Sequence, residues 1–124
     1  MSQKTYSELI AWQRAMDLAV SIYQETENFP KEELYGLRSQ LRRSAVSVPS
    51  NIAEGQARWS RRSFLLYLSI AHGSLCEMET QILLASRLGY FNERQRNGLM
   101  DPCSEVNRLL NGLAKSLKTG NSKL

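Results

Sequence analysis

The sequence predicts an all-α protein that folds as an up-down-up-down antiparallel four-helix bundle. Apolar residues recur at steps of three and four along four successive segments, which is the spacing of one helix face. Turn and capping residues separate these segments, and none alternates apolar and polar residues for long, as a strand would. We expect one domain over residues 1–124, with helices at about 6–28, 31–57, 61–88 and 93–118 and a flexible tail at 119–124.

The first helix is predicted to begin beside Thr5, because Thr5 and Glu8 have the spacing of a capping box. It should end before Pro30, since proline disfavours helical geometry in the preceding residue. Its apolar stripe is expected to consist of Leu9, Trp12, Met16, Ala19 and Tyr23, widened by Val20 and Ile22.

The second helix contains a proline and still keeps its phase. Its predicted stripe passes directly through Pro49 and consists of Leu34, Leu37, Leu41, Ala45, Val48 and Ile52. We therefore expect one continuous helix, kinked where Pro49 cannot donate a hydrogen bond to the Ala45 carbonyl.

The third helix has the most regular pattern in the chain. Its seam alternates steps of four and three at Phe64, Leu68, Ala71, Leu75, Met78, Ile82 and Ala85. Ser60 is the predicted N-cap, and Gly89 is expected to end the helix in the left-handed conformation.

The fourth helix is predicted to begin after Asn92, with Gln95 completing a cap. The stripe includes Leu99, Cys103, Val106, Leu110, Leu113 and Leu117. Pro102 lies inside this pattern, so we expect a second kink or a break of one turn.

The net charge of +4 is concentrated in one quarter of the chain. Residues 31–62 hold seven basic and three acidic residues, while the remaining segments hold nine of each. Clustered arginine suits an anionic partner. The alternative is a solvated helix face with intramolecular ion pairs.

No apolar run approaches the length of a membrane span, and the first residues lack the apolar core of a signal peptide. We therefore expect a cytoplasmic protein without a membrane partner.

Four stretches of the chain resemble one bacterial family: LIAWQRAMDLAVSIYQET, FPKEELYGLRSQLRRSAVSVPSNIAEG, SLCEMETQILLASRLGY and LLNGLAKSL. These are four-helix bundle proteins first met as open reading frames in intervening sequences of 23S ribosomal RNA genes, and they are often mislabelled as a ribosomal protein. The resemblance covers about residues 7–118. The family is similar in fold to the accessory variability determinant of diversity-generating retroelements.

The resemblance implies a homopentamer of four-helix bundles. In the retroelement relative, the pentamer binds nucleic acid and a reverse transcriptase. For the intervening-sequence branch the resemblance implies no biochemical activity, because the family name describes a genomic location. Pro102 and Cys103 depart from the regular acidic fourth helix that the family would lead one to expect.

A polar stripe runs beside the apolar stripe of the second helix and comprises Gln40, Ser44, Ser47, Asn51, Glu54 and Arg58. It predicts either a polar layer against another helix or subunit, or a binding surface. If the second and third helices pair about a turn near residue 60, Arg42 and Arg43 come level with Glu77 and Cys76. We therefore predict an ion pair of Arg42 or Arg43 with Glu77 or Glu79, acting as a register device.

Apolar side chains beyond the four stripes need a place to be buried. The surplus comprises Trp12, Tyr35, Trp59, Leu65, Leu66, Tyr67 and Ile70. It predicts an interface of a homo-oligomer, and a wide core face is the alternative.

Catalytic and metal-binding patterns are scarce. His72 is the single histidine, and Cys76 follows it at the i+4 position, so a thiol–imidazole pair is sterically allowed. No HExxH, GxSxG or phosphate-cradling glycine loop is present. We expect no enzyme activity, no metal, no cofactor and no small-molecule substrate.

The remaining candidate function is nucleic-acid binding. The predicted contact residues are Lys31, Arg38, Arg58, Arg61 and Arg62, with Trp59 available to stack on a base. No RNA-recognition or helix-turn-helix motif accompanies them, so RNA or DNA would be bound without tight sequence choice. The alternative is a scaffold for a protein partner such as a polymerase, with the arginines structural.

Overall fold

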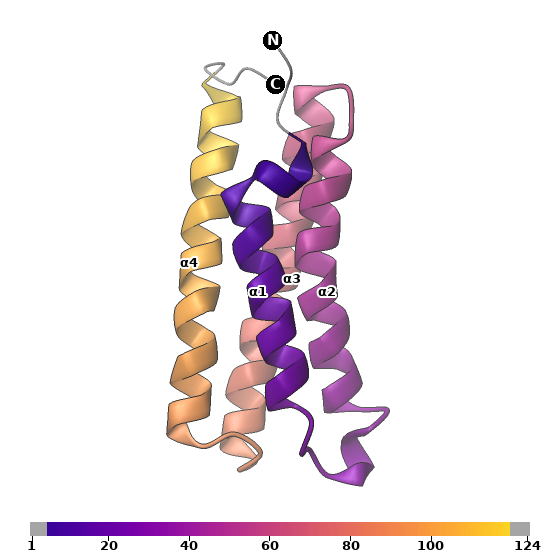
Figure 1. The fold of residues 1–124 in the computed structure, drawn as a ribbon, viewed down its shortest axis with the longest axis vertical. Coiled ribbons are helices and arrows are strands. Elements are labelled where there is room, and N and C mark those ends of the chain that lie inside the picture. Colours follow the sequence, from indigo (N-terminus) through magenta and orange to yellow (C-terminus); the bar gives the residue numbers. More distant parts are fainter. Residues whose placement is uncertain (1–4, 120–124) are drawn as a thin grey trace.

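The structure, a computed structural model, describes residues 5–119 and confirms the predicted all-α antiparallel four-helix bundle (Figure 1). Its long helices are α1 (Ile10–Glu25), α2 (Leu37–Gln56), α3 (Arg61–Arg87) and α4 (Glu93–Lys118), which alternate in direction. Short 3-10 turns, η1 (Tyr6–Glu8) and η2 (Lys31–Glu33), precede α1 and α2. Of the tail predicted to be flexible, residues 120–124 lie outside the described residues.

Each helix packs against two neighbours, α1 and α3 both lying between α2 and α4. The whole predicted seam of α3 is buried, from Phe64 to Ala85. On α2 the stripe is buried from Leu37 to Ile52, whereas Leu34 is exposed because it precedes the helix.

The buried face of α1 differs from the predicted one. Ala11, Ala15 and Leu18 join Ala19 and Ile22 in the core. The expected stripe residues Met16, Val20 and Tyr23 are exposed instead, and Trp12 is half-buried. Since α1 is apolar on two sides, the side with small alanines faces the core, where short side chains let helices approach closely.

Local capping signals act at the ends of α3 and α4. Ser60 Oγ accepts a hydrogen bond from Ser63 N at 3.0 Å, and Asn92 Oδ1 accepts one from Gln95 N at 2.8 Å. Gly89 has φ 83°, and Tyr90 N donates to Ala85 O at 2.9 Å, which completes a left-handed helix stop.

The first two helices begin later than expected. Glu8 accepts a hydrogen bond from Thr5 N at 2.9 Å, but this cap closes η1, and extended Leu9 separates η1 from α1. The helix predicted from residue 31 begins at Leu37, because Gly36 has a non-helical backbone.

Glu33 takes over the capping of α2. Its Oε1 accepts from Leu37 N at 2.9 Å, and its Oε2 accepts from Tyr90 OH at 3.0 Å. The hydrogen bond to Glu33 raises the pKa of Tyr90, with desolvation and the charges of Glu33 and Glu32 adding to it. One carboxylate therefore ties the start of α2 to the loop between α3 and α4.

Both internal prolines lie within continuous helices. α2 passes through Pro49 and α4 through Pro102, so the one-turn break considered for the fourth helix is not formed. The kinks at these residues stay a prediction.

Candidate nucleic-acid interface

The turn between α2 and α3 gathers four of the predicted contact residues at one end of the bundle (Figure 1). The chain leaves α2 at Gln56 and enters α3 at Arg61. Arg58 and Trp59 lie in the turn, and Arg61 and Arg62 form the first turn of α3. The Trp59 side chain is fully exposed, at 102%.

The arginines of this turn differ in how they are held. Arg58 Nη2 donates to Glu54 Oε2 at 3.1 Å and to Tyr67 OH at 2.6 Å, and its guanidinium lies 4.8 Å from the Tyr67 ring centroid. Arg61 and Arg62 are exposed and form no ion pair within residues 5–119. They also occupy a helix N-terminus, where the helix dipole disfavours positive charge.

Two further lysines share this end of the molecule. α4 ends there, and its last turn carries exposed Lys115 and Lys118 (Figure 1). Sequence reasoning missed them, although an antiparallel order of four helices places the end of the fourth at the same end of the bundle as the end of the second. We call the basic end the set Arg58, Trp59, Arg61, Arg62, Lys115 and Lys118.

The other two predicted contact residues lie at the opposite end. Lys31 is in η2, and Arg38 is in the first turn of α2. Arg38 Nη2 lies 3.9 Å from Glu27 Oε1, and its side chain is 20% exposed. The six residues are therefore not brought together as one surface.

The polar stripe of α2 lies along α3 for part of its length. Ser44 Oγ donates to Gln81 Oε1 at 2.8 Å, and both residues are buried. Ser47 and Ser74 hydroxyls are 2.7 Å apart, and Asn51 Nδ2 donates to Ser47 O at 2.8 Å. Toward the ends of the stripe, Gln40, Glu54 and Arg58 are exposed.

The predicted ion pair between α2 and α3 is wrong. Within residues 5–119, no carboxylate oxygen of Glu77 or Glu79 lies within 4.0 Å of a nitrogen of Arg42 or Arg43. Arg43 and Glu77 line one small hollow of about 310 Å³ between α2 and α3 without pairing.

Arg42 instead reaches the end of α1. Its Nε donates to Thr26 Oγ1 at 3.0 Å, its Nη2 donates to Tyr23 O at 3.0 Å, and Nη2 lies 3.7 Å from Glu27 Oε2. The guanidinium is also 4.5 Å from the Tyr23 ring centroid. The physical reason is that the last carbonyls of a helix lack partners within that helix and carry partial negative charge.

The two cysteine thiols lie in different environments. His72 Nε2 and Cys76 Sγ are 3.7 Å apart on the exposed face of α3. Cys103 is buried, and desolvation, followed by the charge of Glu79, raises the pKa of its thiol to about 12. Among the described residues, no group of three or more His, Cys, Asp or Glu side chains could hold a metal ion.

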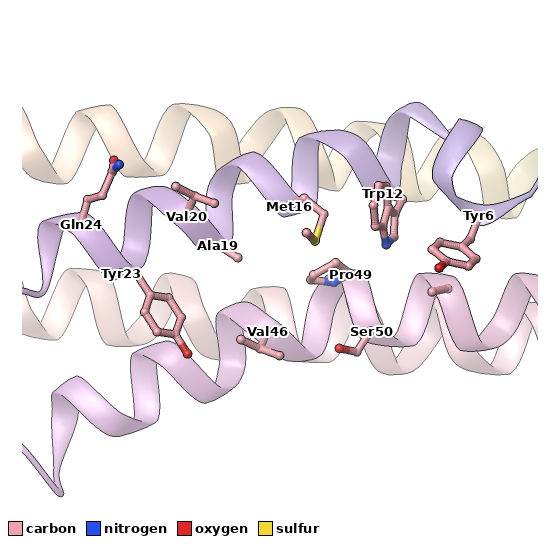
Figure 2. A pocket seen from close by; sticks show the side chains of 11 residues that line it. Tyr6, Trp12, Met16, Ala19, Val20, Tyr23, Gln24, Val46, Pro49 and Ser50 are labelled. Carbon is pink, nitrogen blue, oxygen red and sulfur yellow. The ribbon is translucent and has the colours of Figure 1, made fainter.

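An apolar groove runs along the outer side of α1 and α2. Figure 2 shows α1 side chains along one side and Val46, Pro49 and Ser50 of α2 along the other. Its volume is about 500 Å³. We call this the α1–α2 groove; it is lined by Tyr6, Trp12, Met16, Ala19, Val20, Tyr23, Gln24, Val46, Pro49, Ser50 and Ala53.

None of the helices within residues 5–119 is both long and apolar enough to cross a bilayer.

Comparison with known proteins places the chain in a family. The sequence matches the family described as 23S rRNA-intervening sequence protein over residues 7–112. A similar solved structure is a protein with unknown function from the S23 ribosomal protein family of Bacteroides thetaiotaomicron VPI-5482. That structure is 27% identical with a TM-score of 0.77, and the similarity covers 86% of this chain and 99% of the other. The search of curated proteins finds no relative. The chain belongs to the 23S rRNA-intervening sequence protein family.

Proposed function

We propose that this protein is a non-enzymatic, cytoplasmic homo-oligomer, a pentamer, that binds RNA or DNA through its basic end. The observation that carries the proposal is the pair Arg61 and Arg62, exposed and without an ion pair among the described residues, beside fully exposed Trp59. Arginine suits phosphate contacts, and an exposed indole suits stacking on an unpaired base.

The position of these arginines adds support. Positive charge in the first turn of a helix costs about 0.3–1 kcal/mol for each residue, and α3 has no acidic residue there to offset it. A phosphate bound at this turn would be attracted by both arginines and also by the N-terminus of α3, because helix N-termini attract anions.

Oligomerisation would strengthen the same effect. Five chains of charge +4 would carry about +20, a field that attracts polyanions strongly. The pentamer itself is carried over from the family resemblance. It predicts an affinity that falls steeply as salt rises, because binding releases counterions from the nucleic acid.

The test is fluorescence anisotropy with labelled RNA and DNA hairpins at about 50 mM and about 200 mM salt. The double variant Arg61→Glu with Arg62→Glu should lose at least about tenfold in affinity at low salt. The matched control, Arg87→Glu with Arg94→Glu, makes the same charge change at the opposite end and should bind nearly as the natural chain does. Absent binding at low salt, binding indifferent to salt, or equal losses in both variants would overturn the proposal.

A second candidate function is a scaffold for a protein partner such as a polymerase. It is favoured by the observation that Arg38, Arg42 and Arg58 all have intramolecular partners, as structural arginines would. In this case the Arg61 and Arg62 variant would keep its partner while the hairpin assay showed no binding.

A further inference from the structure

Residues 5–119 leave two apolar surfaces uncovered, and these lie on neighbouring sides of the bundle. The first is the α1–α2 groove, whose lining carries the apolar side of α1 that the core leaves out (Figure 2). Trp12 and Met16 lie one helical turn apart on α1, opposite Pro49 and Ala53 of α2. Aromatic residues and methionine are enriched at the centre of protein interfaces.

The second surface is a row on α3 that starts with two large side chains. Leu66 is 58% exposed, and Ile70, one turn further, is 43% exposed. Gly73 follows after another turn, and a Cβ atom there would meet nothing within 4 Å. Glycine inside a helix costs about 1 kcal/mol relative to alanine, and no contact of the described chain requires it here. A second molecule packed on α3 could approach the helix closely at this position, because no side chain stands there.

The angle between the two surfaces suits a closed ring. α2 contacts both α1 and α3, so the groove and the α3 row lie on neighbouring sides of the bundle. Neighbouring sides of a bundle with a square cross-section are about 90° apart. When one surface of each copy meets the other surface of the next copy, the assembly closes if the rotation fits. The required angle is about 90° for four copies and about 108° for five.

The two surfaces also lie at the same position along the bundle axis, which is called their height below. Ser74 of α3 is level with Ser47 of α2, since their hydroxyls are in contact. Because α2 and α3 are antiparallel, Ile70 is level with Asn51, which lies between the groove residues Pro49 and Ala53. In a ring whose axis is parallel to the helices, groups of equal height meet, so Ile70 faces the apolar centre of the neighbour's groove.

The charges below this level complement each other. By the same counting, Glu77 is level with Ser44, the residue next to Arg43. Neither Glu77 nor Arg43 has an ion-pair partner within residues 5–119. Arg43 also lines a second hollow, which adjoins the α1–α2 groove and shares Tyr23 and Val46 with it. The neighbour's Glu77 would therefore meet Arg43 where the apolar contact ends.

We propose that a second copy of this chain docks the Leu66–Ile70–Gly73 row of α3 into the α1–α2 groove, and that repetition of this contact closes the homo-oligomeric ring. The inference rests on the proposed function, because it assigns the surfaces that build the proposed homo-oligomer.

The first test measures mass by light scattering for the full-length chain and two variants. Ile70→Glu should reduce the mass to that of one chain while circular dichroism shows unchanged helix content. Leu83→Glu is the matched control, because Leu83 is 44% exposed on the same helix but lies outside the row. It should keep the mass of the natural chain.

The second test locates the contact directly by disulfide formation. In a Cys76→Ser background, Met16→Cys combined with Ile70→Cys should give a ladder of linked chains under oxidation. Met16→Cys combined with Leu83→Cys should not. The buried Cys103 remains in both proteins.

The outcomes separate this inference from the proposed function. If the natural chain is oligomeric but Ile70→Glu keeps its mass and no ladder forms, the docking is overturned, the groove is left to another partner, and the proposed function stands. If the natural chain is monomeric, the docking and the oligomeric part of the proposed function both fail. The hairpin assay then decides nucleic-acid binding separately.

Discussion

Replacing Gly55 by alanine should force α2 and α3 apart near the basic end. A Cβ atom at Gly55 would lie 2.6 Å from Tyr67 Cβ and 3.1 Å from Phe64 Cδ1. Carbon atoms pack at about 3.5–4.0 Å, so a separation of about 1 Å is needed. Tyr67 Cβ is fixed to the α3 backbone and cannot rotate away, so the helices themselves must move.

The net cost follows from two opposing terms. Overpacking a well-packed site costs about 1–3 kcal/mol, and this rigid contact belongs in the upper half of that range. Alanine recovers up to about 1 kcal/mol of helix propensity. The free energy of unfolding should therefore fall by about 1–3 kcal/mol, and Tm by about 4 °C for each kcal/mol in a chain of this length.

The assay is thermal unfolding followed by circular dichroism, with Gly98→Ala as the control. Gly98 is an exposed residue of α4, and a Cβ atom there would meet nothing within 4 Å. The same chemical change should raise Tm slightly at Gly98 and lower it at Gly55. If Gly55→Ala is as stable as the natural chain, the close approach of α2 and α3 at this residue is refuted.

Two further predictions concern side chains whose surroundings differ sharply. At pH 8 a thiol reagent should modify exposed Cys76 quickly and leave Cys103 unmodified, because burial raises the pKa of the Cys103 thiol to about 12. Denaturant should make Cys103 reactive as well. Two fast-reacting thiols in the folded protein would contradict this prediction. Arg42→Ala should lower the free energy of unfolding by about 1–3 kcal/mol, measured in urea, because two charged hydrogen bonds to the end of α1 are lost. Arg108→Ala, which removes an exposed arginine of α4 that forms no ion pair within residues 5–119, should change it by less than about 0.5 kcal/mol, and equal effects would argue against the Arg42 contacts.

The parts of the fold that local chemistry controls could be predicted from the sequence. Ser60, Gly89 and Asn92 act through neighbouring backbone groups, so their roles at the ends of α3 and α4 follow from spacing alone. The phase of α2 also carries through Pro49, because tertiary packing of the stripe outweighs one missing hydrogen bond.

The parts that depend on tertiary choice could not be predicted in this way. α1 has two apolar sides, and periodicity does not say which one faces the core, so the stripe predicted to contain Met16 and Tyr23 is wrong at these exposed residues. The sequence predicts a partner for Arg42 on α3, whereas its actual contact with the end of α1 depends on tertiary geometry. Lys115 joins the basic end only through the topology of the bundle.

The proline inside α2 lowers the conformational entropy that is lost when a partner covers the α1–α2 groove. Part of its lining is made of Ala19, Pro49 and Ala53, which have no rotamer freedom to lose when a partner covers them. The pyrrolidine ring also holds its own backbone torsion fixed, so this part of the surface has the same shape before and after contact. Only the longer side chains, such as Met16, give up conformational entropy on docking, at about 0.5–1.5 kcal/mol for each one immobilised. Ala19 and Pro49 are already buried in the single chain, so they form a rigid floor, and the hydrophobic gain of docking comes from the exposed side chains around it.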